Sequence, residues 1–335
     1  MPISAMSRHR TAVIRIAALT LVNAMVFQEV LSTQDKRVDP LRKLLRSQDP
    51  VSALATQWDY ISLNIDYVPI FRVARDLLLE LPGDKDVTDA VSFLGEQALS
   101  IVSKRAALKH DLMGRVYHRL LVEAKFLGTY YTSVPAATLL LKLALGPKRW
   151  KTDWASIEEL KDFRVADLAC GTGTLLMAAA EALSDNYVNA ASAAGASLDL
   201  ARLHQSIIED VIFGYDVLPS ALHLTASTLA LRSSSVAFGK TNLFSLPLGG
   251  HHKRLGSVEF LRSKDIALSL DLFGTSEGTK QVTGKGDVGE TYIRLPDIDL
   301  CVMNPPFTRS VGGNLCSGPF PSLSARRCRR ISRQS

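Results

Sequence analysis

The chain has few of the residues that build metal sites or disulfide frameworks. Its 335 residues include four cysteines, and no two of them have the C-x2-C spacing that is typical of a metal site. Four cysteines are also too few for a secreted disulfide scaffold, so the composition favours a reducing cytoplasm. We interpret Cys170 and Cys301, each near the end of a predicted strand, as small buried hydrophobic residues.

Acidic residues are missing from the segment 301–335, and their absence explains the net charge. The chain carries a formal charge of +6. Six arginines in that segment account for the whole excess: Arg309, Arg326, Arg327, Arg329, Arg330 and Arg333. Residues 1–300 are therefore balanced, and bulk charge does not support nucleic-acid binding. A phosphate-binding surface would require local segregation of charge.

One apolar run, residues 11–31, has the length of a membrane anchor and follows two arginines. Polar residues interrupt its apolar face: Arg15, Asn23, Gln28 and Glu29. No small-residue cleavage site of a signal peptide stands out. We therefore predict that this run is a core helix of an N-terminal helical domain, with no membrane as partner.

The composition, 47% hydrophobic and 21% charged, agrees with a globular enzyme of two domains. We predict a helical N-terminal domain over residues 1–125, a catalytic domain over 126–307, and a basic low-complexity tail over 308–335. The first domain contains periodic apolar stretches at Val68–Leu81, Val87–Val102 and Leu112–Leu121, with a break at Pro82-Gly83-Asp84. Whether this domain docks a partner or faces DNA is left open.

The most informative motif is Asn304-Pro305-Pro306-Phe307, which follows an apolar run, Ile298–Met303, predicted to be a buried strand. The Asn304 side-chain oxygen and the Pro305 carbonyl can both accept hydrogen bonds from a planar NH2 group. Neither proline has a competing N–H, and Phe307 offers a face on which a base can stack. The tripeptide Asn-Pro-Pro also ends ordinary strands and loops. The motif alone therefore does not decide between a site for a planar amino group and an ordinary strand end.

A glycine turn lies upstream, between a short strand-like run, Phe163–Cys170, and a predicted helix, Leu175–Leu183. This arrangement lets a cofactor approach backbone N–H groups at a helix N-terminus. The turn is G-x-G and lacks the third glycine of a dinucleotide-binding loop, because Leu176 stands there. Asp167 and the small residues after it fit the methionyl part of S-adenosylmethionine instead.

The next predicted strand, Val211–Val217, carries an acid near its end, and Pro219 then begins a helix that runs to Leu231. Asp216 could accept both hydroxyls of a ribose. The alternative is that Asp216 only N-caps this helix. Residues 184–208 resemble a helical insertion, which accounts for the long spacing between the two acids.

These motifs, DLACGTG, GYDVLPSA and NPPF in that order, resemble the adenine-specific (N-6) DNA methyltransferases, and in particular the modification subunits of restriction systems. Residues 128–135, GTYYTSVP, resemble that family's G-x-Y-Y-T-P motif with the proline displaced to Pro135. The motif order is the family's gamma arrangement, and the resemblance covers residues 110–315. It implies an α/β, Rossmann-like class I S-adenosylmethionine-dependent methyltransferase fold, with an incomplete sheet, after the helical domain.

The resemblance also implies the roles of individual residues. Those expected to bind S-adenosylmethionine are Tyr131, Thr132, Asp167, Ala169, Cys170, Gly171, Thr172, Gly173, Asp216 and Val217. Those expected to act on the target base are Asn304, Pro305, Pro306 and Phe307. The segment 256–259 is a further candidate for the adenine ring of the cofactor. No metal is implied, because a sulfonium methyl is already activated and the protein only has to orient an amine towards it.

The implied substrate is an adenine in duplex DNA, which must flip out of the stack to reach such a pocket. A specificity subunit or a missing C-terminal region is an implied partner. Two alternatives stay open: methylation of a protein glutamine or a ribosomal RNA guanine, whose enzymes favour NPPY, and a catalytically dead remnant that only binds cofactor.

The tail raises the question of whether the catalytic domain is whole. After Leu315 the sequence has no apolar period, so the predicted NPPF strand would keep an unpaired edge. One explanation is a frameshift near Leu315, since the same nucleotides read one base over can encode Leu-Phe-Gly-Ser-Leu-Pro-Glu. A natural basic tail that binds nucleic acid is the alternative. If the chain is a fragment, we expect that it cannot methylate DNA alone.

Overall fold

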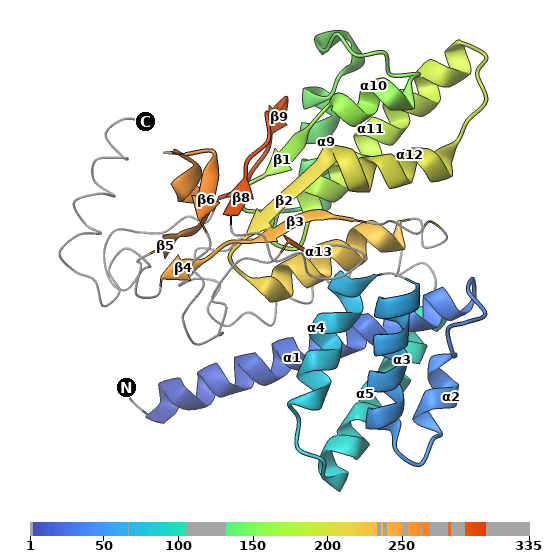
Figure 1. Cartoon of the computed structure of the whole chain (residues 1–335), viewed down its shortest axis with the longest axis vertical. Helices are drawn as coiled ribbons and strands as arrows, with labels where there is room; N and C mark the ends of the chain where they lie inside the picture. Colours follow the sequence, from blue (N-terminus) through green and yellow to red (C-terminus); the bar gives the residue numbers. More distant parts are fainter. Residues whose placement is uncertain are drawn as a thin grey trace, which may run out of the picture.

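The computed structural model describes residues 3–65, 67–104, 132–232, 236, 240–249, 254–261, 263–267, 281–282 and 292–305. This part of the chain is a mixed α/β structure with a largely parallel sheet and a helical N-terminal region (Figure 1). The predicted helical stretch Leu112–Leu121 and the tail after residue 305 lie outside the described residues.

The helical region consists of α1 (Ile3–Ser32), α2 (Leu41–Leu45), α3 (Pro50–Asn64), α4 (Val68–Leu79) and α5 (Lys85–Ser103). Short polar side chains begin two of these helices. The Asp49 carboxylate accepts a hydrogen bond from the Ser52 N–H, and Asp84 does the same for Val87. The predicted break at residues 82–84 is therefore confirmed, because Asp84 is the N-cap of α5.

Helix α1 contains the apolar run that could be mistaken for a membrane anchor. Within the described residues, Val13–Ser32 is the one helical stretch long and apolar enough to cross a membrane. About half of its most apolar window, 56%, is nevertheless buried inside the protein. Gln28 is fully buried, accepts a hydrogen bond from the Trp58 indole (2.8 Å) and donates one to the Asp39 carbonyl (2.9 Å). Asn23, Gln28 and Glu29 of α1 thus have hydrogen-bond partners inside the fold, as in a core helix.

The main sheet contains β1 (Val165–Asp167), β2 (Ile212–Asp216), β3 (Asn242–Ser245), β7 (Gln281–Val282) and β9 (Leu300–Cys301), in the order β7-β3-β2-β1-β9. All neighbours in it are parallel except β3 and β7. Val165 of β1 pairs with Ile212 on one side and with Leu300 on the other. The other described strands form two separate antiparallel pairs. These are β4 (Leu248–Gly249) with β5 (Arg254–Leu255), and β6 (Asp265–Ala267) with β8 (Tyr292–Arg294).

The remaining helical elements are α9 (Val134–Ala144), η1 (Pro147–Arg149), α10 (Ile157–Asp162), α11 (Thr174–Ala193), α12 (Leu200–Ser206), η2 (Ile207–Val211), α13 (Pro219–Leu231) and η3 (Gly256–Leu261). The segment predicted to be a helical insertion is thus largely helical: it contains the end of α11 and all of α12. Helix α13 packs against β2 and β3 on one side and against α1 and α4 on the other (Figure 1). It therefore connects the sheet to the helical region.

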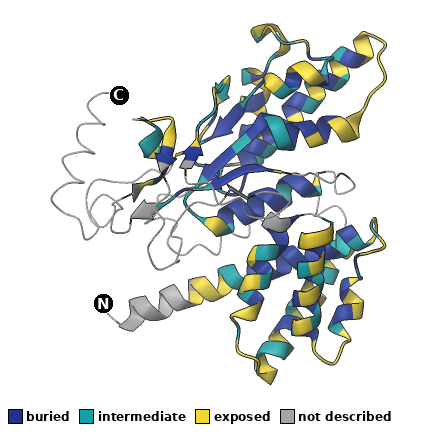
Figure 2. Cartoon of the chain, in the orientation of Figure 1, coloured by how far each residue is buried: buried dark blue, intermediate teal, exposed yellow. Residues whose placement is uncertain are grey.

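Alternate residues of the strands face two separate cores, as the period of a β-strand requires. Val165, Ile212 and Leu243 join the large core formed with the helices. Ala166 and Phe244 face a smaller core on the opposite side of the sheet, together with residues of β6 and β8. Figure 2 shows the inner strands of the sheet coloured mainly as buried.

Strand β9 differs from the prediction. We expected a buried strand over Ile298–Met303, but β9 is only two residues long and lies at the end of the described sheet. Val302 is buried, whereas Cys301 is exposed, so the interpretation of Cys301 as a buried residue was wrong. An edge strand has a neighbour on one side only, which leaves its side chains less covered. The buried state predicted for Cys170 is confirmed.

Candidate active site

The carboxyl ends of the parallel strands β1, β2 and β9 meet at one edge of the sheet, where open α/β sheets bind their ligands. Asp167 ends β1, Asp216 ends β2, and Asn304 follows β9 by three residues. A hydrogen bond from the Val302 N–H to the Ala166 carbonyl (2.9 Å) continues the pairing beyond β9. The topology thus gathers three residues that lie far apart in the sequence.

The glycine turn after β1 has the backbone conformation that its sequence predicts. Gly171 and Gly173 both have positive φ angles, +55° and +82°. The Gly173 N–H donates to the Cys170 carbonyl at 2.8 Å and closes the turn. Gly173 is the N-cap of α11 and has no side chain with which to cap it. The start of α11 therefore presents backbone N–H groups beside the end of β1, which suits a polar ligand.

Asp216, at the end of β2, forms a hydrogen bond with the glycine turn. One carboxylate oxygen accepts a hydrogen bond from the Gly171 N–H (2.8 Å), and the other accepts from the Leu218 N–H (2.9 Å). The N-cap of α13 is Leu218, so the alternative in which Asp216 only caps this helix is wrong. Burial raises the pKa of Asp216, and its backbone donors oppose that rise.

Asp167 is the more deeply buried of the two acids, with 1% of its surface exposed. It accepts a hydrogen bond from the Ala169 N–H (3.0 Å). Burial raises the pKa of Asp167 to about 7, and the nearby Asp216 adds to this effect. Two carboxyl groups in a poorly hydrated site favour a ligand that carries positive charge, because a cation would stabilise both ionised forms.

Thr225 of α13 supports the glycine turn, and the sequence reasoning missed it. Its hydroxyl is 2.9 Å from the Gly171 carbonyl and 3.1 Å from the Ala221 carbonyl of its own helix. A Cβ atom added to Gly173 would lie 2.7 Å from the Thr225 methyl group, so the two residues are in tight contact. Helix α13 contains two threonines in a largely apolar sequence, and no local pattern distinguished Thr225 for this role.

On the proposed target side, Asn304 contacts the segment that resembles the G-x-Y-Y-T-P motif. Its side-chain NH2 donates a hydrogen bond to the Thr132 hydroxyl at 3.1 Å, across 172 positions of sequence. Thr132 immediately precedes Ser133, whose hydroxyl caps α9 by accepting from the Ala136 N–H. The displaced Pro135 lies in the first turn of that helix, where proline is tolerated. The altered motif is therefore compatible with a normal helix start.

The other predicted site residues fall into two groups. Tyr131, Pro306 and Phe307 lie outside the described residues, so their positions are not established. Cys170 and Thr172 are buried in the turn, Ala169 and Val217 are partly exposed beside it, and Pro305 is exposed. Burial raises the pKa of the Cys170 thiol well above its usual range, which makes it a packing residue rather than a nucleophile.

The segment 256–259 forms part of η3, which packs against β2. Gly256 has a φ angle of +60°, and a Cβ atom there would lie 2.8 Å from a Val217 methyl group. This segment therefore lies next to one of the predicted cofactor residues. Within the described part of the chain, no group of three or more His, Cys, Asp or Glu side chains is placed to bind a metal ion.

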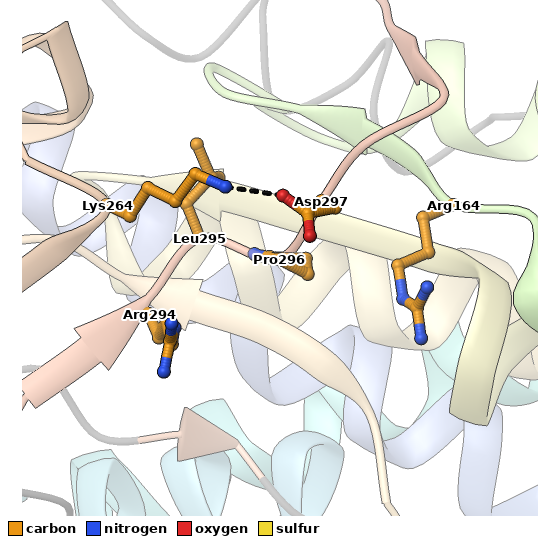
Figure 3. Close-up of a pocket in the computed structure, with 6 residues that line it drawn as sticks. All are labelled: Arg164, Lys264, Arg294, Leu295, Pro296 and Asp297. Carbon is orange, nitrogen blue, oxygen red and sulfur yellow. Dashed lines mark hydrogen bonds and ion pairs between the residues drawn. The ribbon is translucent and has the colours of Figure 1, made fainter.

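A cavity of about 260 Å³ lies elsewhere, near the connection between β8 and β9 (Figure 3). Its lining residues are Arg164, Lys264, Arg294, Leu295, Pro296 and Asp297. The Lys264 ammonium forms an ion pair with Asp297, as the dashed line in Figure 3 marks. Arg164 precedes β1, so its backbone lies at the amino end of the sheet, away from Asp167 and Asp216. This cavity is not part of the candidate site.

The candidate site thus combines a glycine turn, two acids and an Asn-Pro pair at one edge of a parallel sheet. Residues 108–248 match the family model described as N-6 DNA Methylase. The matched stretch contains the glycine turn, Asp167 and Asp216.

No curated protein sequence matches the chain. A solved structure described as the cryo-EM structure of a DrdV–DNA complex is 13% identical, with a TM-score of 0.37. The match covers 73% of this chain and 26% of that one. The chain thus spans about a quarter of the length of the protein in that structure.

Proposed function

We propose that this protein transfers a methyl group from S-adenosylmethionine to the exocyclic amino group of an adenine in DNA, as the modification enzyme of a restriction system. Residues 108–248 match a family model described as N-6 DNA Methylase, which supports methylation of adenine in DNA at the level of the family. The observation that carries the finer proposal is the hydrogen bond between Thr132 and Asn304. It brings the motif expected to bind the cofactor into contact with the motif expected to bind the target base.

The residues around the glycine turn fit the proposed cofactor. A Cβ atom on Gly171 would meet nothing within 4 Å, so the described residues leave open space at this turn. Each Asp216 oxygen accepts one backbone N–H, and a carboxylate oxygen can accept two hydrogen bonds, so both keep capacity for ribose hydroxyls. The two buried acids suit a cofactor that carries a sulfonium and an ammonium group. In this proposal Thr132 lies towards the methionine carboxylate.

The proposed chemistry needs little from the protein beyond orientation. The cofactor, when bound, supplies a methyl group that is already activated on sulfur. The Asn304 side-chain oxygen and the Pro305 carbonyl accept the two hydrogens of the adenine amino group. These contacts aim the nitrogen lone pair at the methyl group and stabilise the positive charge that develops on nitrogen. The proposed flipped adenine stacks on Phe307.

The proposal includes the fold class and the domain arrangement. We propose a Rossmann-like class I methyltransferase fold for the sheet and its helices, preceded by a helical N-terminal domain over residues 1–125. Support comes from the parallel order β3-β2-β1-β9 and from helices α11 and α13, which connect consecutive parallel strands. The cytoplasm is the proposed location, since the substrate is DNA.

The first test is cofactor binding by the full 335-residue chain, measured by calorimetry with S-adenosylmethionine. We expect Asp216→Ala to weaken binding at least about tenfold, because a hydrogen bond to a charged group contributes roughly 1.5–3 kcal/mol. Circular dichroism of the variant controls for loss of folding. A folded wild-type chain that binds no S-adenosylmethionine would exclude the proposal.

The second test is the transfer of labelled methyl groups to separate DNA, RNA and protein fractions, with Asn304→Ala as the background. Label in N6-methyladenine of DNA supports the proposed reaction. Label in a protein glutamine or in guanine of RNA supports the alternative substrates instead. Cofactor binding without transfer to any fraction supports a catalytically dead remnant, or a chain that needs a further segment or subunit.

A further inference from the structure

The Asn304 amide can point in two ways, and only one of them suits the proposed reaction. Its carbonyl oxygen must be free to accept a hydrogen of the target amino group, so its NH2 must point elsewhere. If the amide were turned over, the Thr132 hydroxyl could donate to the carbonyl oxygen and would occupy it. In the structure the NH2 donates to the Thr132 oxygen, and within the described residues no donor contacts the Asn304 carbonyl oxygen.

Thr132 can hold this orientation because its own position is anchored. It precedes α9, which packs along α11, the helix that follows the glycine turn. The two helices are joined by an ion pair between Lys142 and Asp185 (3.2 Å). They are also joined by a hydrogen bond from the Asn186 side chain to the Leu145 carbonyl at the end of α9 (2.8 Å). The Thr132 hydroxyl that contacts Asn304 is therefore anchored, through α9, to the helix that follows the glycine turn.

Asn304 lacks comparable support from its own strand. β9 is a two-residue strand at the end of the described sheet, and its neighbours Met303 and Pro305 are exposed. An asparagine side chain on such a segment would sample several rotamers, and ordering it costs conformational entropy. A single hydrogen bond to a well-anchored partner removes part of that cost before the substrate binds.

We propose that Thr132 is a positioning residue for methyl transfer: its hydroxyl accepts the Asn304 NH2 and thereby turns the Asn304 carbonyl oxygen towards the target amino group. This inference rests on the proposed function of Asn304. It also predicts that a bound cofactor fixes the orientation of the Asn304 amide, because the Thr132 hydroxyl has only one proton to donate. When that proton is donated to an anionic group of a bound cofactor, the hydroxyl can only accept from Asn304, which excludes the inverted amide.

The direct test is NMR of the full-length chain with 15N-labelled asparagine side chains, of which there are seven. The Asn304 signals are assigned by their loss in Asn304→Ser. We expect Thr132→Val, which removes the hydroxyl at nearly constant volume, to shift both Asn304 NH2 protons and speed their exchange with water. Thr132→Ser should retain the wild-type signals. Unchanged Asn304 signals in Thr132→Val would overturn the proposal.

Ser133→Ala is the matched control, because it removes the neighbouring hydroxyl that caps α9 and leaves the Asn304 partner in place. It should lower the thermal midpoint without moving the Asn304 signals. If Ser133→Ala shifts these signals as much as Thr132→Val does, Thr132 acts only through the start of α9, and the proposal fails.

Methyl transfer gives a second readout that a purely structural role would not reproduce. With saturating S-adenosylmethionine, kcat should fall about 5- to 10-fold in Thr132→Val, the effect of one hydrogen bond, and Thr132→Ser should restore it. A loss confined to the KM for the cofactor, with kcat unchanged, would contradict a positioning role. If the wild-type chain transfers no methyl group, the proposed function is in question, but the NMR result still decides how the amide is held.

Discussion

The two halves of the candidate site are built differently, although they meet at one edge of one sheet. On the cofactor side, β1 has a neighbour on each side, and the turn after it is held by Asp216 and by Thr225. On the target side, β9 lies at the end of the described sheet, and the Asn304 side chain makes one hydrogen bond to the described residues. The glycine turn is held by several mutually supporting side-chain contacts, whereas the Asn304 side chain has one contact within the described part of the chain.

This difference agrees with what each half is proposed to do. A small cofactor of constant shape is bound well by a rigid turn, because rigidity lowers the entropic cost of binding. A base that has flipped out of DNA must enter from the solvent, so its side of the site has to be open. We therefore expect substitutions on the cofactor side to alter stability, and substitutions on the target side to alter activity while leaving stability nearly unchanged.

The largest effect is expected from Gly173→Ala. An L-residue with a φ angle of +82° costs about 1–2 kcal/mol, and a Cβ atom 2.7 Å from the Thr225 methyl group adds roughly 1–3 kcal/mol of overpacking. Urea denaturation should show the combined loss. Gly171→Ala should cost only about 1–2 kcal/mol, because its φ angle is also positive but its Cβ atom would meet nothing within 4 Å.

Thr225→Ser sharpens this comparison, because it removes the methyl group and keeps the hydroxyl. In combination with Gly173→Ala it should recover part of the lost stability, and with Gly171→Ala it should recover none. Equal losses in the two glycine variants would mean that contact with Thr225 does not restrict the turn.

The next largest effect concerns pH. The pKa of Asp167 is raised to about 7 from an ordinary value of 3.8, so the folded state holds a proton that the unfolded state has already lost. The contribution of Asp167 to the free energy of unfolding is most favourable below about pH 4, and the stability of the protein falls as the pH rises towards 7. Asp167→Asn removes this dependence. We expect it to be more stable than the wild type at pH 8, on the order of 2–4 kcal/mol, with a smaller difference at pH 5.

Urea denaturation of both proteins at pH 5 and pH 8 measures this difference. Binding of a cationic cofactor should lower the pKa of Asp167, so S-adenosylmethionine should bind more tightly at pH 8 than at pH 6. Parallel pH profiles for the wild type and Asp167→Asn would contradict the assignment of the titrating group to Asp167.

A moderate effect is expected from Thr225→Val, which replaces the hydroxyl by a methyl group. The Gly171 carbonyl loses its donor, which should cost about 1 kcal/mol of stability and weaken cofactor binding several-fold. Calorimetry with S-adenosylmethionine measures the binding loss, and Thr225→Ser serves as the control that keeps the hydroxyl. Unchanged affinity in Thr225→Val would show that the turn keeps its shape without this bond.

The smallest effect is expected at Cys301. It is exposed at the sheet edge, so Cys301→Ser should change stability by less than about 0.5 kcal/mol. Cys170→Ser places a hydroxyl in a buried position, and we expect it to cost about 1–3 kcal/mol. Thermal denaturation compares the two directly. A large loss at Cys301 would imply that β9 is covered by residues outside the described part.

Several features of the fold could be predicted from the sequence because they depend on neighbours along the chain. The strand, glycine turn and helix around residues 165–193 were predicted from local patterns, and so was the helix that begins at Pro219. The break before α5 follows from Pro82 and from the capping preference of Asp84. The core position of α1 was predicted from the polar residues that interrupt its apolar run.

Other features could not be predicted, because they depend on which surfaces the chain brings together. The burial of Cys301 was predicted wrongly, since an apolar run does not reveal whether its strand lies inside a sheet or at the edge. The role of Thr225 depends on the packing of α13 under the glycine turn. The burial of Asp167, which raises its pKa, is likewise a property of the assembled site.

The sequence by itself determined the resemblance to a family, the order of the motifs and the residue types available for chemistry, because these depend on local spacing and on side-chain functional groups. The tertiary structure alone decided that Thr132 contacts Asn304 across 172 positions, that Asp216 holds the glycine turn rather than capping a helix, and that β9 lies at the end of the described sheet. These are contacts between distant segments, and a parallel sheet creates them only when its strands pair in one particular order.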